Sequence, residues 1–211
     1  MSRGGRVPRV AVAAVALAAA VLASSAAAGG KPRAVPPTAP IAFSSIPWLT
    51  PADSVAGLLE ARGYRGTKAE AGDAGLAAEG RLFERDALVL GWLDERDRLL
   101  RWTVTIRADE QRDGYAEMRK VYDDAVAEAE SKYGRRERWV DRFTFPYEKG
   151  DGHEADALRE GDAVIRSAWA DREGDRLTIE MAPRGDVVLT YECPGWSALQ
   201  TRIRQRKGRD L

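Results

Sequence analysis

Cysteine and histidine are nearly absent from this chain of 211 residues, which holds one of each, Cys193 and His153. A single cysteine cannot form an intramolecular disulfide, so the fold must depend on an ordinary hydrophobic core. A single histidine leaves a serine or cysteine triad only one residue to use as its base. The sequence also lacks a glycine-rich phosphate-binding loop. These absences argue against most familiar enzymes, and we expect no catalytic residues and no cofactor.

Long apolar runs are missing except near the N-terminus. Arg3, Arg6 and Arg9 precede an Ala-rich apolar run over residues 10–23, and Ala26 and Ala28 then form an A-x-A pair. This pattern predicts a signal peptide over residues 1–28 and an exported protein, periplasmic or extracellular, with no transmembrane span after cleavage. Retention of the segment as an N-terminal anchor is the alternative that the sequence leaves open.

An excess of basic charge is missing too. The 33 basic and 33 acidic residues balance, and cleavage after Ala28 would remove three arginines, leaving the mature chain mildly acidic. A general nucleic-acid-binding protein would instead be basic, so no nucleic-acid partner is expected. Basic residues do gather in the C-terminal tail, where a solvated end is predicted and contact with an anionic surface is the alternative; they are Arg202, Arg204, Arg206, Lys207 and Arg209.

Proline and glycine mark residues 29–40 as an extended linker. The rest, 41–207, is predicted to be a single α+β domain, with an antiparallel β-meander and helices largely on one face. Two similar stretches, 92–99 and 169–177, leave open whether residues 41–134 and 135–207 are related halves or only share a hairpin chemistry.

Helix signals occur at residues 50–53 and over residues 113–133. Thr50, Pro51 and Asp53 predict a capped helix start, with Thr50 as the N-cap and Asp53 completing a capping box. A second helix is predicted over residues 113–133, because apolar and tyrosine side chains recur there at three- and four-residue steps.

Strand signals fill most of the remaining chain. Leu100, Trp102, Val104 and Ile106 alternate with polar residues after a charged turn at 94–98, which predicts one buried face. Further strands are predicted over 74–83, 138–145, 163–171, 176–183 and 186–193. Cys193 shares the alternating face of the last strand, so it is interpreted as a buried core residue.

The segment 151–154, Asp-Gly-His-Glu, contains the only histidine beside two acids. Asp151 and Glu154 have the spacing of a capping box at a helix start, and this is the favoured interpretation. Asp151, His153 and Glu154 are also weak candidates for a metal site, with Asp156 as a further ligand. Their spacing matches neither the HExxH zinc helix nor the calcium loop of EF-hands.

Three segments carry a resemblance: IPW at 46–48, PYEKGDGHE at 146–154 and YECPGW at 191–196. Together they resemble an uncharacterised family of exported bacterial proteins with an IPW helix opening and a PY-x-x-GDG-x-E segment. The resemblance implies no catalytic residues, although it makes the GDG segment a hallmark of the family. The architecture is loosely similar to the SmpA/OmlA outer-membrane assembly lipoproteins and to the β-lactamase-inhibitor-like fold, which are binding and scaffold modules. The lipid-attachment cysteine of those lipoproteins is missing here.

These observations predict a non-catalytic binding or scaffold module of the periplasm or cell envelope. It would be a monomer or weak dimer that contacts an unknown protein or envelope component through a sheet face or strand edge. Two alternatives stay open: a small hydrolase or metal-dependent enzyme centred on residues 151–154, and a carrier of lipid or another small ligand.

Overall fold

The computed structural model describes residues 40–66, 75–109 and 114–207, and these belong to one compact unit. The predicted signal peptide, nearly all of the predicted linker, and Arg209 lie outside the described residues. The unit has the α+β fold that the sequence predicted, with a single antiparallel sheet and helices that pack mainly on one side of it.

The strands of the described residues form one sheet in the order β1-β2-β3-β4-β8-β7-β6-β5. Each set of four consecutive strands is a meander, and the two meanders join where β4 pairs with β8. Whether they descend from a duplication stays a prediction. The strands are β1 Arg65–Gly66, β2 Leu76–Leu82, β3 Arg85–Leu93, β4 Leu99–Ile106, β5 Arg138–Phe143, β6 Ala163–Ala170, β7 Arg176–Met181 and β8 Val187–Glu192.

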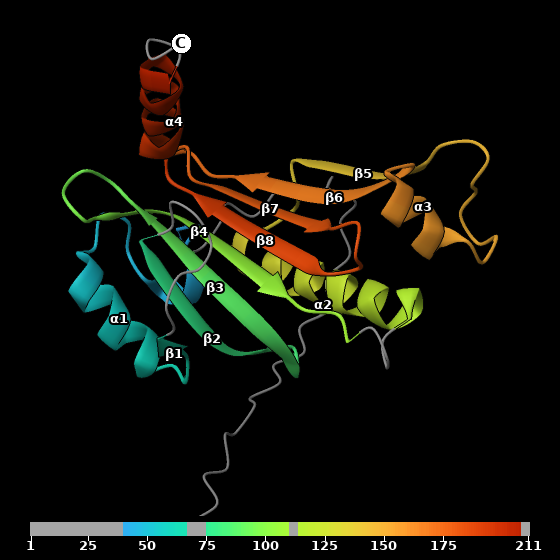
Figure 1. The fold of residues 1–211 in the computed structure, drawn as a ribbon, viewed down its shortest axis with the longest axis horizontal. Helices are drawn as coiled ribbons and strands as arrows, with labels where there is room; N and C mark the ends of the chain where they lie inside the picture. The colour runs from blue at the N-terminus through green and yellow to red at the C-terminus, as the bar shows by residue number, and fades with distance from the viewer. Residues whose placement is uncertain (1–39, 67–74, 110–113, 208–211) are drawn as a thin grey trace, which may run out of the picture. The chain divides into compact units, whose positions relative to one another are not determined.

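Four α-helices and one short 3-10 turn accompany the described strands. Figure 1 shows α2 lying along one face of the sheet, while α4 rises from the end of β8 on the other side. The bounds are η1 Phe43–Ser45, α1 Ala52–Glu60, α2 Tyr115–Tyr133, α3 Glu154–Glu160 and α4 Pro194–Lys207. We call the face covered by α2 the inner face and the opposite one the outer face.

The main core lies between the inner face and helices α1, α2 and α3. Trp102, Val104 and Ile106 of β4 are fully buried there, as their alternation predicted. The α2 side chains that meet the sheet recur at helical spacing, so one stripe of this helix is buried and the rest is solvated. They are Met118, Val121, Tyr122, Ala125, Val126, Ala129 and Tyr133.

A second, smaller cluster attaches α4 to the outer side of the sheet end. Leu100, Cys193 and Trp196 are buried together, and the guanidinium of Arg101 lies 4.8 and 5.1 Å from the ring centroids of Trp92 and Trp196. The prediction that Leu100 shares the face of Trp102 is wrong, because the pairing of β3 with β4 shifts register beside it and Leu100 becomes the extra residue of a bulge.

Cys193 is buried as predicted, although it follows β8 and packs in this second cluster rather than under α2. Burial raises the pKa of its thiol, which disfavours the reactive thiolate. The packing therefore supports a structural role for this residue.

The predicted cap of the first helix is wrong. Thr50 donates its hydroxyl hydrogen bond to the carbonyl of Pro47 at 2.7 Å, and α1 begins at Ala52 without a side-chain cap. The cause is a tertiary contact: the N–H of Leu99 donates to the Thr50 carbonyl, and the N–H of Ala52 donates to the Asp97 carbonyl. This segment therefore pairs with the β3–β4 turn before the helix starts.

Candidate functional site

The predicted site residues Asp151, His153 and Glu154 lie in the loop between β5 and α3, where the two acids support the local backbone. Asp151 accepts hydrogen bonds from the N–H groups of Glu148 and His153, at 2.8 and 2.7 Å. Glu154 accepts one from the N–H of Gly150, at 2.9 Å. The N–H donors lower the pKa of Asp151, so its carboxylate is ionised at neutral pH.

The predicted capping box is not formed. The N-cap of α3 is His153, without a side-chain cap, and Glu154 is the first helical residue. Gly150 and Gly152 adopt φ of +88° and +84°, which turns the chain so that Asp151 bonds to the loop instead of the helix. The segment is still a helix entrance, but both acids serve the turn that precedes the helix.

A different set of acids comes together in the β6–β7 turn. Among the described residues, only Asp171, Glu173 and Asp175 bring three potential metal-ligating atoms within 4.8 Å of one another. Asp175 is 5% exposed, and burial followed by the charge of Asp171 raises its pKa to about 6, although Trp48 acts against the shift. The sequence of this segment predicts a hairpin turn, and the acids at every second position, Asp171, Glu173 and Asp175, are the signal in the sequence that points to the cluster.

Exposed apolar side chains lie on the edge strand β5 and two residues beyond its end. Trp139, Val140 and Phe145 are 63%, 41% and 90% exposed, and in the described part of the chain only Leu49 is a comparable large apolar residue. Trp139 and Val140 are successive residues, so they lie on opposite faces of the strand, and each face of this edge carries an exposed apolar group. We call Trp139, Val140 and Phe145 the β5 edge surface.

The backbone of β5 is paired on one side only, because β5 ends the strand order. Thr144 donates its N–H to Asp162 at 2.7 Å, which fixes the alternation of hydrogen-bonded pairs with β6. It follows that Trp139, Asp141 and Phe143 turn their N–H and C=O groups to the free edge. Such a row of peptide groups can accept a further strand.

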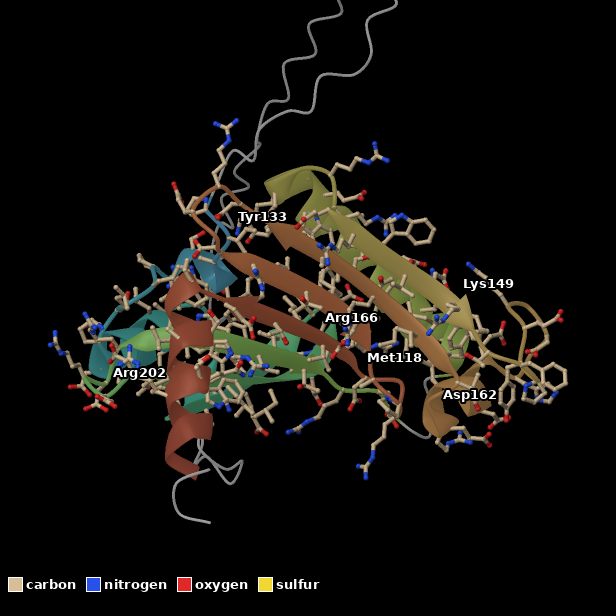
Figure 2. The ribbon with its side chains drawn as sticks, turned by 90° about the horizontal axis from the view of Figure 1, so that it is seen from above. Met118, Tyr133, Lys149, Asp162, Arg166 and Arg202 are labelled. Atoms are coloured by element: carbon tan, nitrogen blue, oxygen red, sulfur yellow. The ribbon has the colours of Figure 1, made fainter. Side chains whose placement is uncertain are left out.

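A groove of about 270 Å³ separates this edge from α2. In it, Asp141 of β5 accepts hydrogen bonds from Arg119 of α2 at 3.1 Å and from Lys149 at 2.7 Å. Lys149 is labelled near the end of β5 in Figure 2. Partial burial opposes ionisation of Asp141, but the two cations outweigh it and lower its pKa. One oxygen of Asp141 and one nitrogen of Arg119 are nevertheless buried without a partner, so the groove keeps unused bonding capacity.

The far end of the groove is held by a chain of polar contacts. Arg136 lies 3.2 Å from Glu130 and donates to the hydroxyl of Ser167 at 3.1 Å, and Ser167 also bonds to the Tyr122 hydroxyl at 2.8 Å. The Arg136 guanidinium is 5.6 Å from the Trp139 ring centroid. This cation–π contact fixes the exposed indole beside the groove.

On the outer face of the sheet, two ion pairs bridge neighbouring strands. Figure 2 looks onto this face and labels Arg166 of β6, which donates to Glu180 of β7 at 2.8 Å. Arg101 lies 3.5 Å from Glu192. Threonines fill the middle of the face, with Thr103, Thr190 and Thr178 in register across three strands.

None of the helices among the described residues is long and apolar enough to cross a membrane. No known protein family, characterised protein or solved structure matches this chain in sequence or fold. The resemblance to exported bacterial proteins therefore stays a prediction.

Proposed function

We propose that this protein is an exported, non-catalytic binding module of the cell envelope, and that the free edge of β5 binds an extended segment of a partner protein. The observation that carries the proposal is the coincidence, on one strand, of unpaired backbone groups and the β5 edge surface. Strand addition uses both, since backbone bonds supply affinity and alternate side chains supply specificity. Asp151 and Glu154 accept hydrogen bonds from backbone N–H groups of their own loop. This structural use of both acids supports a binding module rather than an enzyme centred on residues 151–154.

The charges beside the edge define the partner. Arg138 and Arg142 are exposed on the outer side of β5, flanking Val140, whereas Trp139 lies on the inner side. A strand added here would place alternate residues beside the two arginines and the others beside the indole. The matching segment alternates acidic and apolar residues.

Self-association through this edge is disfavoured. If two copies paired their β5 strands antiparallel about Val140, Arg138 of each copy would face Arg142 of the other. Like charges directly opposite one another destabilise a strand pair. The protein is therefore proposed to be monomeric until it meets its partner.

The test is binding of fluorescein-labelled ten-residue peptides that alternate Glu with Val, measured by anisotropy beside a Lys–Val peptide. We expect the Glu–Val peptide to bind about tenfold more tightly than the Lys–Val peptide at low salt. Its glutamates would be attracted to Arg138 and Arg142, whereas the lysines of the other peptide would be repelled by them. Arg138→Glu with Arg142→Glu should reverse the preference. Trp139→Ala should weaken both peptides, and Leu49→Ala, an exposed apolar residue away from the edge, serves as the matched control.

Strand addition also predicts which peptide N–H groups matter. In an antiparallel pair, the residues of the peptide opposite Trp139 and Asp141 are the apolar ones, and their N–H groups point to β5. N-methylation of the apolar residues should abolish binding, and N-methylation of the acidic residues should leave it. Equal tolerance of both modifications would sink the proposal.

Export is tested separately. Cell fractionation and the intact mass of the purified protein should show a chain in the envelope or medium that begins near Gly29. A chain that keeps residues 1–28 and stays with the membrane would support the anchor alternative instead.

A further inference from the structure

A cavity of about 130 Å³ lies between α2 and the inner face of the sheet, away from the β5 edge. It exists because α2 presents alanines, Ala125 and Ala129, where its neighbouring turns present Tyr122 and Tyr133. Side chains of β7 and β8, including Ile179 and Leu189, form the opposite wall. Two alanines at i and i+4 thus leave a gap that the rest of the helix stripe fills.

One polar group of the cavity wall is left without a partner. Tyr191 is 7% exposed and lines the cavity, and its hydroxyl makes no hydrogen bond within the described residues. The buried tyrosines of α2 behave differently, since Tyr122 bonds to Ser167 and Tyr133 donates to the carbonyl of Ala42 at 3.1 Å. The Tyr191 hydroxyl is not among the fully enclosed polar atoms that lack a partner, so it keeps some accessible surface and can bond to a ligand in the cavity.

The mouth of the cavity holds strained backbone. Ser44 and Phe83 both line it, and both have φ of +50°, a conformation that costs about 1 kcal/mol in a residue other than glycine. The Phe83 ring is partly buried against the core. Glu128 and Lys132 of α2 complete the rim. Figure 2 labels Tyr133, the last residue of α2, at this end of the helix.

Size and chemistry together define a ligand class. This space is open to solvent at its mouth, and its volume is comparable to that of the closed cavities of about 150 Å³ that bind benzene. The walls are mainly apolar and aromatic, so water would find few partners there, whereas a ring would replace the missing contacts. We propose that this cavity binds a single aromatic ring that carries one hydroxyl group, a simple phenol, whose hydroxyl pairs with that of Tyr191. This site is independent of the proposed strand-binding edge.

The experiment uses ¹⁹F NMR titration of the full chain with 4-fluorophenol and with fluorobenzene, which lacks the hydroxyl. We expect saturable binding of 4-fluorophenol with a Kd of about 0.1–1 mM, and weaker binding of fluorobenzene by about fivefold, the usual effect of one neutral hydrogen bond. Tyr191→Phe should remove this preference. Tyr122→Phe, which also deletes a buried tyrosine hydroxyl but outside the cavity, should keep it.

Filling the cavity gives the second arm. Ala129→Leu should abolish binding of both probes while the circular dichroism of the folded protein is unchanged. Equal affinity of wild type for the two probes, absence of saturation, or full binding by a folded Ala129→Leu variant would each overturn the proposal. If Ala129→Leu does not fold, the proposal is still tested by the other two variants: Tyr191→Phe should lose the preference for 4-fluorophenol over fluorobenzene, and Tyr122→Phe should keep it. Peptide binding at β5 should be unaffected by Tyr191→Phe and Ala129→Leu, so the two proposals can fail separately.

Discussion

The turns β3–β4 and β6–β7 have the same backbone hydrogen bonds and opposite electrostatics. In each five-residue turn, the first residue is an aspartate that accepts the N–H groups of the third and fifth residues on one carboxylate oxygen. Its own N–H donates to the carbonyl of the fifth residue, at 2.8 Å in Asp94–Arg98 and 3.1 Å in Asp171–Asp175. The shared aspartate therefore supports the turn in both places.

The fifth residue separates the two turns. Arg98 places its guanidinium on Asp94, at 2.9 and 2.7 Å, and these bonds lower the pKa of Asp94 although partial burial opposes them. Asp175 instead brings a second carboxylate to Asp171 and is itself buried. The backbone motif therefore tolerates either charge at its end, so the acid at position 175 is not required to form the turn.

The largest expected effect comes from removing the first aspartate. Asp94→Ala loses two acceptor bonds and the Arg98 pair, and we expect the free energy of unfolding to fall by about 2–3 kcal/mol. Asp171→Ala loses three acceptor bonds, of which the one from the N–H of Ile41 is long at 3.5 Å, but it relieves the repulsion with Asp175, so a fall of about 1–2 kcal/mol is expected. Urea unfolding at pH 7.5 measures both, with Asp94→Asn as a control that keeps an acceptor. A larger loss for Asp171→Ala would contradict this account.

The next effect is a dependence on pH. Folding raises the pKa of Asp175 from 3.8 to about 6, so the folded state holds this proton more tightly than the unfolded chain. Stability should therefore fall as the pH rises from about 4 to about 6 and stay lower above that range. Asp175→Asn should stabilise the protein by about 1–2 kcal/mol at pH 7.5 and remove this part of the pH profile. An unchanged profile would show that Asp175 ionises freely in the folded state.

The smallest effect concerns the fourth residue, which is left-handed in both turns. Asp97 has φ of +54°, and Gly174 has φ of +91°. Asp97→Gly should stabilise the protein by about 0.5 kcal/mol, whereas Gly174→Ala should cost about 1 kcal/mol, because a Cβ there would also lie 3.3 Å from Pro194. Thermal melts of the two variants should shift in opposite directions, and shifts of the same sign would refute the equivalence of the turns.

Local patterns were sufficient to predict most of the elements. The alternation in β4 and the helical stripe of α2 depend only on neighbours along the chain, and both were predicted close to their observed bounds. The cap at Thr50 failed because its carbonyl is taken by Leu99, a partner 49 residues away. Long-range pairing of this kind leaves no trace in the spacing of residues.

The candidate site was harder to predict for the same reason. A strand with the composition of β5 would bury Trp139 if it lay in the middle of the sheet, and only the strand order makes it an edge. Likewise, the acids of the β6–β7 turn were visible in the sequence, but the burial of Asp175 depends on how the chain around Trp48 covers that end of the sheet.

The packing of α4 has a spectroscopic consequence. The indoles of Trp92 and Trp196 lie with ring centroids 6.2 Å apart and planes inclined at 61°. Transition dipoles this close and this far from parallel couple as an exciton pair, which splits the far-ultraviolet circular dichroism of tryptophan into two bands of opposite sign. Because Trp196 belongs to α4 and Trp92 to β3, the couplet is a built-in optical signal of whether the C-terminal helix is docked on the sheet.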